Sequence, residues 1–191
     1  MGNREDLLAG ARKAILERGL AKVTARDIAG AAGVSLAAIG YHFGTKDRLI
    51  TEAVNEAAGT ELGDGMDAAI RDAGEGRALA ESLESTWDGM LDVIQNHREQ
   101  LLLSFENGFR LMREPHEYEN YMGEAIDRVY AGLADVLRQT HPDLAAAEAR
   151  SLAKVYFALF QGLAVQWMLA PAADTATGAD VARAARAMGR E

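Results

Sequence analysis

Apolar residues recur along most of the chain at intervals of three or four positions, the spacing of one face of an α-helix. The first series is formed by Leu7, Leu8, Ala11, Ile15 and Leu16. Gly19 follows, and a glycine there can end the helix in the left-handed conformation. Alanine-rich stretches are common, whereas runs of β-branched residues are absent. The pattern predicts an all-α fold.

Two short helices are predicted directly after this first helix. Thr24 can cap the second helix, and Asp27 can reach back as the acidic partner of a capping box. Gly33 ends that helix at a position where a positive φ is cheap only for glycine. Ser35 then caps a third helix that runs to about His42.

The size and connection of these two helices are those of a helix-turn-helix. Ala29 stands where the helices should approach most closely, and Ile28, Val34 and Ile39 supply an apolar inner face. Such a pair sets one helix across a DNA duplex and the next in its major groove.

Helices are predicted for the rest of the chain as well. A fourth helix begins at Lys46 and leads to the glycine-rich segment 59–65, and we expect this helix to join two domains, 1–48 and 49–191. The further helices expected are 77–97, 98–113, 116–140, 143–170 and 179–188. The apolar run 155–170 is shorter than the roughly 20 residues of a membrane span, and we interpret it as a buried helix.

Charge is divided unevenly along the chain. Residues 1–50 contain 8 Lys and Arg against 5 Asp and Glu, a net charge of +3. Residues 51–191 carry a net charge of −12, which gives −9 for the whole chain. Because DNA phosphates attract positive charge, the first segment is the candidate for a nucleic-acid partner.

The outward residues of the third helix are available to DNA if the inner face is assigned correctly. They are Ser35, Leu36, Ala37, Ala38, Gly40, Tyr41 and His42. Tyr41 and His42 can donate to phosphate oxygens, as can Lys46 with the free amides that begin the fourth helix. Leu36 or Ala37 can touch a thymine methyl group, and Arg26 is the best candidate for a guanine contact.

Three segments resemble the DNA-binding region of the TetR (tetracycline repressor) family. They are TARDIAGAAGVS at 24–35, IGYHF at 39–43 and KDRL at 46–49. The resemblance implies an all-α homodimer whose C-terminal domain binds a small inducer and thereby releases an operator of double-stranded DNA.

The same resemblance implies roles for single residues. Those expected to hold the DNA backbone are Thr24, Ser35, Tyr41, His42 and Lys46, whereas Arg26, Ala37 and Gly40 would face bases. Ala25, between two of these positions, completes the predicted DNA-binding set. Gly40 departs from the family, because many members have an aromatic residue there.

Aromatic, methionine and glutamine side chains in the second half are candidates for an apolar ligand pocket, although plain core is the favoured interpretation of any single one. The predicted ligand-binding residues are Trp87, Met90, Phe105, Phe109, Met112, Tyr118, Met122, Tyr156, Phe160 and Gln161. A four-helix seam between two subunits is expected from the last long helices. Its predicted residues are Tyr130, Leu133, Leu137, Leu152, Tyr156, Leu159, Gly162 and Leu163.

Several other classes of protein are disfavoured by the composition. The chain has no cysteine, and the N-terminus lacks an apolar signal core, which fits a cytoplasmic protein. We expect no metal site and no cofactor, and we interpret His97, His116 and His141 as surface histidines. Two alternatives stay open: an all-α enzyme acting on an apolar substrate, and an adaptor whose helix-turn-helix contacts proteins. No nucleophile paired with a base supports the enzyme.

Overall fold

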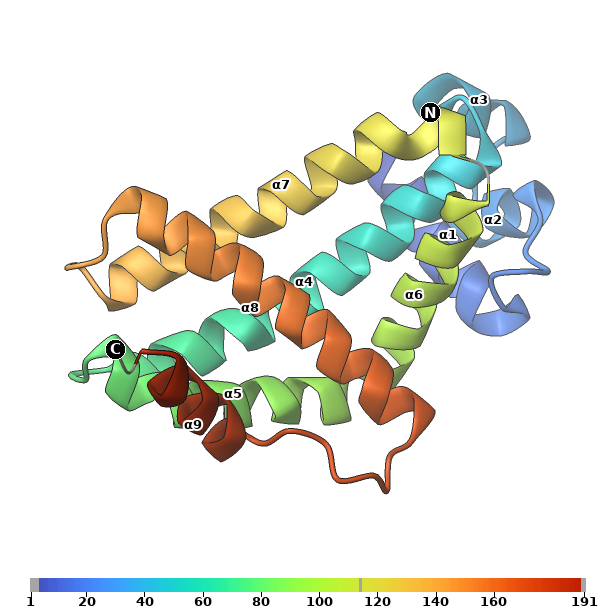
Figure 1. Ribbon diagram of the computed structural model, residues 1–191. Coiled ribbons are helices and arrows are strands. Elements are labelled where there is room, and N and C mark those ends of the chain that lie inside the picture. Colours follow the sequence, from blue (N-terminus) through green and yellow to red (C-terminus); the bar gives the residue numbers. More distant parts are fainter. Residues whose placement is uncertain (1–3, 114, 190–191) are drawn as a thin grey trace. The chain divides into compact units, whose positions relative to one another are not determined.

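The structure, a computed structural model, describes residues 4–113 and 115–189, with the side chains of 115–120 left undescribed. Every regular element in these residues is a helix, as the sequence predicts (Figure 1). The helices are α1 (Arg4–Arg18), α2 (Ala25–Ala32), α3 (Leu36–Phe43), α4 (Lys46–Gly74), α5 (Leu79–Asn96), α6 (Arg98–Met112), α7 (Pro115–Thr140), α8 (Ala146–Leu169) and α9 (Gly178–Met188).

The chain packs as two compact units. Unit 1 consists of Met1–Thr60 and Glu99–Pro115, and unit 2 consists of Glu61–Arg98 and His116–Glu191. Unit 1 therefore contains α6 in addition to the helices predicted for the first domain. Packing divides the first segment of the chain after Thr60 and not after residue 48. The functional boundary after residue 48 remains a prediction.

The core of unit 1 is built from the faces that the sequence pattern predicted. Its large members include Leu7, Ile28, Ile39, Phe43 and Leu49, all of which are buried. Val34 and, from α6, Leu103 pack against this cluster as partly buried residues. Burying Ile28 and Ile39 inward leaves the opposite face of the two short helices outside the core.

Helix α4 continues through the glycine-rich segment and ends only at Gly74. Each glycine in a helix interior costs roughly 1 kcal/mol relative to alanine. This cost is offset because Leu62, Met66 and Ile70 repeat at four-residue spacing and are buried. Gly65 has a packing role as well, because a Cβ there would lie 2.8 Å from a methyl group of Val93 on α5.

In unit 2, α9 is anchored on α5, and α8 runs back from the end of α7 (Figure 1). The backbone N–H of Gly178 donates to the Asp88 carboxylate at 3.0 Å. Between α7 and α8, the Arg150 guanidinium lies 2.8 Å from the Asp127 carboxylate and stacks over the Tyr130 ring. These contacts hold the helices around a core that includes Trp87.

Two sequence interpretations in unit 2 are corrected. Helix α8 is 24 residues long, enough by length and composition to cross a membrane, and only 28% of its most apolar window is buried. The prediction that its apolar run is too short for a membrane span is therefore wrong. Within one chain α8 is only partly buried, and the cover of its exposed side by a second subunit remains a prediction. His141 is buried at the end of α7 and is not a surface histidine. Burial lowers the pKa of its imidazole below the ordinary value.

The predicted subunit seam also needs correction. Leu133, Leu137, Tyr156 and Leu163 are buried within a single chain, so their side chains cannot form the surface of a seam. Two predicted seam residues of α8, Leu159 and Gly162, are exposed, and they belong to a stripe of exposed positions along this helix. We name it the α8 stripe: Val155, Leu159, Gly162, Gln166 and Leu169.

Candidate nucleic-acid interface

The start of α2 is fixed by the capping box that the sequence predicted. The Thr24 hydroxyl accepts from the Asp27 backbone N–H at 3.2 Å, and the Asp27 carboxylate accepts from the Thr24 backbone N–H at 3.0 Å. Hydrogen bonds from the Thr24 hydroxyl and backbone hold the pKa of Asp27 below its ordinary value. At the other end of α2, Gly33 adopts φ +68°, the left-handed conformation expected of the turn glycine.

Helix α3 begins after Ser35, which occupies the predicted cap position. Its side chain makes no capping hydrogen bond to the helix. The exposed hydroxyl therefore remains available to an external acceptor such as a phosphate oxygen.

The outward face of α3 is open, as a helix that enters a groove requires. Tyr41 is 85% exposed and Leu36 50% exposed. Ser35, Ala37 and Gly40 are exposed too, whereas Ala38 and His42 are half-buried. From α2 and the residue before it, Thr24 and Arg26 are exposed and Ala25 is half-buried. The predicted residues lie on the surface of unit 1, and their contacts with DNA remain predictions.

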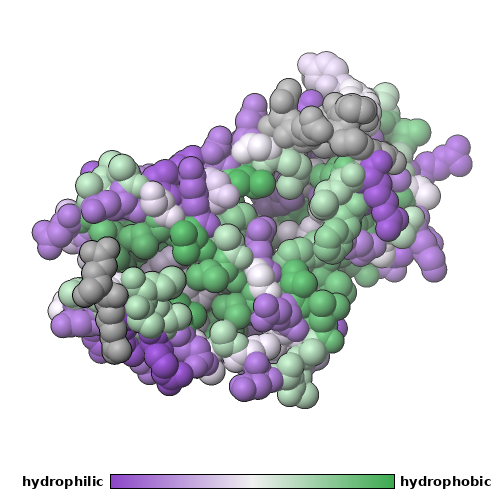
Figure 2. Space-filling model, viewed as in Figure 1, coloured by the Kyte–Doolittle hydropathy of each residue, from purple (hydrophilic) through white to green (hydrophobic). Residues whose placement is uncertain are grey.

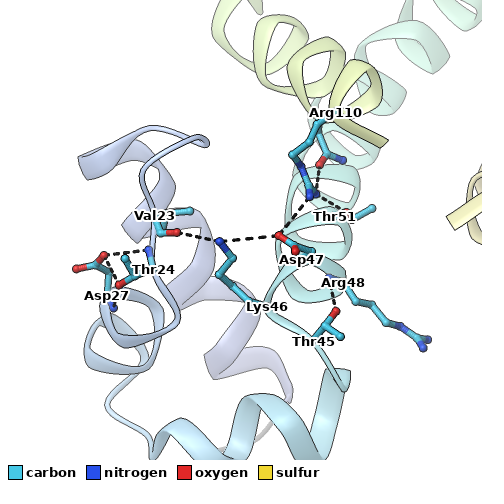
Figure 3. Close-up of polar contacts among 10 residues, drawn as sticks. Val23, Thr24, Asp27, Thr45, Lys46, Asp47, Arg48, Thr51 and Arg110 are labelled. Carbon is cyan, nitrogen blue, oxygen red and sulfur yellow. Dashed lines mark hydrogen bonds and ion pairs between the residues drawn. The ribbon is translucent and has the colours of Figure 1, made fainter. Parts of the chain in front are cut away.

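Lys46 is held by protein groups at the start of α4 (Figure 3). Its ammonium donates to the Val23 carbonyl at 3.3 Å and lies 3.9 Å from the Asp47 carboxylate. The lysine thus ties α4 to the residue that precedes the cap of α2. A phosphate contact by Lys46 requires that its ammonium share or exchange these contacts.

Arg110 on α6 extends the same polar network (Figure 3). Its guanidinium lies 3.2 Å from the Asp47 carboxylate and donates to the Thr51 hydroxyl at 3.1 Å and to Asn107 at 3.0 Å. Because Thr51 and Asn107 are buried, this arginine joins α6 firmly to α4 within unit 1. Sequence reasoning missed Arg110, since no local pattern links positions 47 and 110.

Gly10 is a second residue that sequence reasoning missed. A Cβ there would lie 2.6 Å from the Ala32 side chain and 2.7 Å from the Ala32 backbone nitrogen. The glycine therefore lets α1 approach the end of α2 closely enough to support the turn. A glycine on the buried face of a predicted helix was the available signal.

The predicted ligand-binding residues do not gather in one place. Four of them are buried in unit 2: Trp87, Met90, Tyr156 and Phe160. Gln161 is exposed on α8, and Met122 is half-buried on α7. Tyr118 lies outside the described side chains.

The remaining three ligand candidates are on α6, in unit 1. Phe105 is half-buried and stacks on exposed Phe109 with ring centroids 6.3 Å apart, and Met112 is exposed. A hollow of about 330 Å³ between α4 and α5 is lined by none of the predicted ligand residues. Its lining residues are Ala69, Asp72, Ala73, Arg77, Ser85 and Gly89.

Comparison with known proteins supplies independent evidence. Residues 7–53 match the family model of bacterial regulatory proteins, tetR family. A comparison with curated protein sequences finds no match. The solved structure of multidrug binding protein EbrR with imidazole superposes with a TM-score of 0.65 at 23% identity, over 97% of this chain and 93% of that one.

Two further solved structures give similar values. A protein from Mesorhizobium loti assigned to the TetR family has a TM-score of 0.62 and 19% identity, with 96% of this chain and 91% of that chain covered. A transcriptional regulator from Rhodococcus sp. Rha1 has a TM-score of 0.55 and 22% identity, with 95% and 91% covered. Identities this low show a common fold, and the predicted fold class is confirmed.

Proposed function

We propose that the chain is a regulator of the tetR family, whose model matches its residues 7–53, and that it works as a homodimeric repressor. In this proposal each subunit reads one half of a near-palindromic DNA operator, and a small molecule bound in unit 2 releases the DNA. The chain has no enzymatic role in this scheme, and it acts in the cytoplasm.

The observation that carries the DNA-binding proposal is the bare outward face of α3. Ser35, Ala37 and Tyr41 all project from this face and are exposed, while Ile39 on the opposite side is buried. Small residues at 37 and 40 let the helix backbone approach base edges closely, and the Ser35 and Tyr41 hydroxyls can donate to phosphates. The net charge of +3 over residues 1–50 favours the same partner.

A second copy of the chain is the partner that fits the α8 stripe. Val155 and Leu159 are 53% and 41% exposed, and hydrophobic residues gather along the path of α8 in the space-filling view (Figure 2). Gly162 has open space around its Cα, so a partner helix can approach closely there. The exposed Gln166 in the stripe favours a protein partner over lipid, since its amide needs hydrogen bonds.

Leu159→Glu is expected to convert the dimer to monomers, because a carboxylate would be buried at the seam between two copies. Losing the second DNA-binding unit should lower the affinity for a palindromic duplex by about 100-fold or more. Sedimentation velocity and a gel-shift titration measure the two effects. Leu16→Glu, at a 71% exposed leucine of α1, is the matched control and should stay dimeric. A dimeric Leu159→Glu protein would rule out the α8 seam.

The regulatory ligand is proposed from the chemistry of unit 2. Its core contains Trp87, Met90, Tyr156 and Phe160, side chains that suit an apolar, aromatic molecule. The structurally similar EbrR was solved in complex with imidazole and with proflavin, which supports a small-molecule role for this fold.

The experiment that tests the proposed function is a selection of duplexes from a random-sequence pool by the purified protein. We expect enrichment of a near-palindromic site whose half-sites are about one helical turn, roughly 34 Å, apart. Each enriched duplex should bind two chains. A pool that shows no enriched sequence would contradict a sequence-specific regulator and favour the adaptor.

A further inference from the structure

The core of unit 2 contains an indole N–H with no acceptor among the described residues. Trp87 is 1% exposed, and its Nε1 atom has no hydrogen-bond partner. The ring packs against Tyr156, with centroids 5.3 Å apart and planes tilted by 58°. A buried hydrogen-bond donor without an acceptor destabilises a folded protein. The unpaired N–H of Trp87 therefore needs an explanation, and an acceptor on a bound ligand would supply one.

The surroundings of this donor are apolar. Met90 follows Trp87 by one helical turn on α5, and Phe160 follows Tyr156 by one turn on α8, and all four side chains are buried. The buried hydroxyls nearby in sequence serve their own helix, because Thr86 donates to the Ser82 carbonyl at 2.9 Å. Met90 has three rotatable bonds, which makes it the neighbour that can move to admit a ligand.

The scarcity of buried charge in unit 2 indicates which class of ligand can accept a hydrogen bond from the Trp87 indole. Among its described residues, His141 is the only buried side chain of a charge-bearing type, and burial lowers the pKa of its imidazole. Burial also raises the pKa of Tyr156 to about 12, so the phenol next to Trp87 stays neutral. An ionic ligand would therefore meet no fixed buried counter-charge in this core, which disfavours it strongly.

We propose that Trp87 is a ligand-binding residue whose indole N–H donates to a neutral carbonyl or ether oxygen of an apolar molecule bound between α5 and α8. The inference rests on the proposed function of unit 2 as the sensor of a small molecule. It names the chemical class, an uncharged aromatic compound with one strong hydrogen-bond acceptor. In the bound state the acceptor satisfies Nε1, and Tyr156 and Phe160 cover the apolar part.

Two probes of nearly equal shape test the hydrogen bond: 2-acetylnaphthalene, which has a carbonyl oxygen, and 2-isopropenylnaphthalene, which has a CH₂ group in its place. Calorimetric titration gives the ratio of their affinities for each variant. The ratio in wild type should exceed that in Trp87→Phe by about tenfold, since this variant keeps an aromatic ring but lacks the donor, and the volume it also loses affects both probes alike.

Trp167→Phe is the matched control, because Trp167 is the other tryptophan of the chain and is half-buried on α8. Its affinity ratio should equal that of wild type. If Trp87→Phe does not fold, the indole N–H resonance of Trp87 in wild type gives the answer: the ketone should move it downfield and the alkene should not. Equal ratios in wild type and Trp87→Phe, an unmoved resonance, or no binding of either probe would overturn the proposal.

Release of the selected duplex by the ketone is measured separately in a gel shift. If the ketone binds through Trp87 and the DNA stays bound, the donor assignment stands and the inducer role fails. If the protein selects no duplex at all, the regulator function fails, while the affinity ratio still decides the role of Trp87.

Discussion

Gly10→Ala is expected to destabilise unit 1 by about 2 kcal/mol, although alanine is the better helix former. The added methyl group would lie 2.6–2.9 Å from the side chain and backbone of Ala32, so α1 and α2 must move apart. Backbone atoms cannot turn aside as a flexible side chain can. Urea unfolding followed by circular dichroism measures the loss.

Gly30→Ala is the matched control for this experiment. Gly30 is an exposed residue of α2, and a Cβ there would meet nothing within 4 Å. This substitution should be neutral or stabilise by about 0.5–1 kcal/mol, because alanine restricts the unfolded chain. Equal effects of the two substitutions would show that α1 and α2 do not meet at Gly10.

Local signals in the sequence were sufficient for the helix-turn-helix. Thr24 and Asp27 form a capping box, Gly33 adopts positive φ, and Ile28 and Ile39 are buried, all as expected. Each of these features depends on residues within one or two turns of one another. Short-range hydrogen bonding and helical periodicity therefore determine this motif, and the sequence expresses both directly.

Contacts between distant segments could not be predicted in this way. Arg110 meets Asp47 across 63 positions, and nothing near either residue indicates the other. The predicted seam on α8 mixed buried with exposed residues for a related reason. Apolar residues surround most of that helix, so periodicity alone could not tell Leu163, which is buried, from Leu159, which is 41% exposed.

Ala37→Glu is expected to abolish specific DNA binding while leaving the fold intact. Ala37 is exposed in the first turn of α3, where a carboxylate interacts favourably with the helix dipole, so stability should not fall. If this face meets DNA, the phosphates repel the new carboxylate. The longer side chain also prevents the backbone of α3 from approaching the base edges closely. We expect an affinity loss of about 100-fold or more.

The measurement that tests the DNA-facing role of α3 most directly is the affinity of this variant for the selected duplex, compared with that of Ala9→Glu. Ala9 is an exposed alanine of α1, so the control makes the same change in net charge away from the proposed interface. We predict that Ala9→Glu binds within a few-fold of wild type and that Ala37→Glu does not bind measurably. Equal affinities of the two variants would contradict the account, because DNA would then meet the protein somewhere other than the outward face of α3.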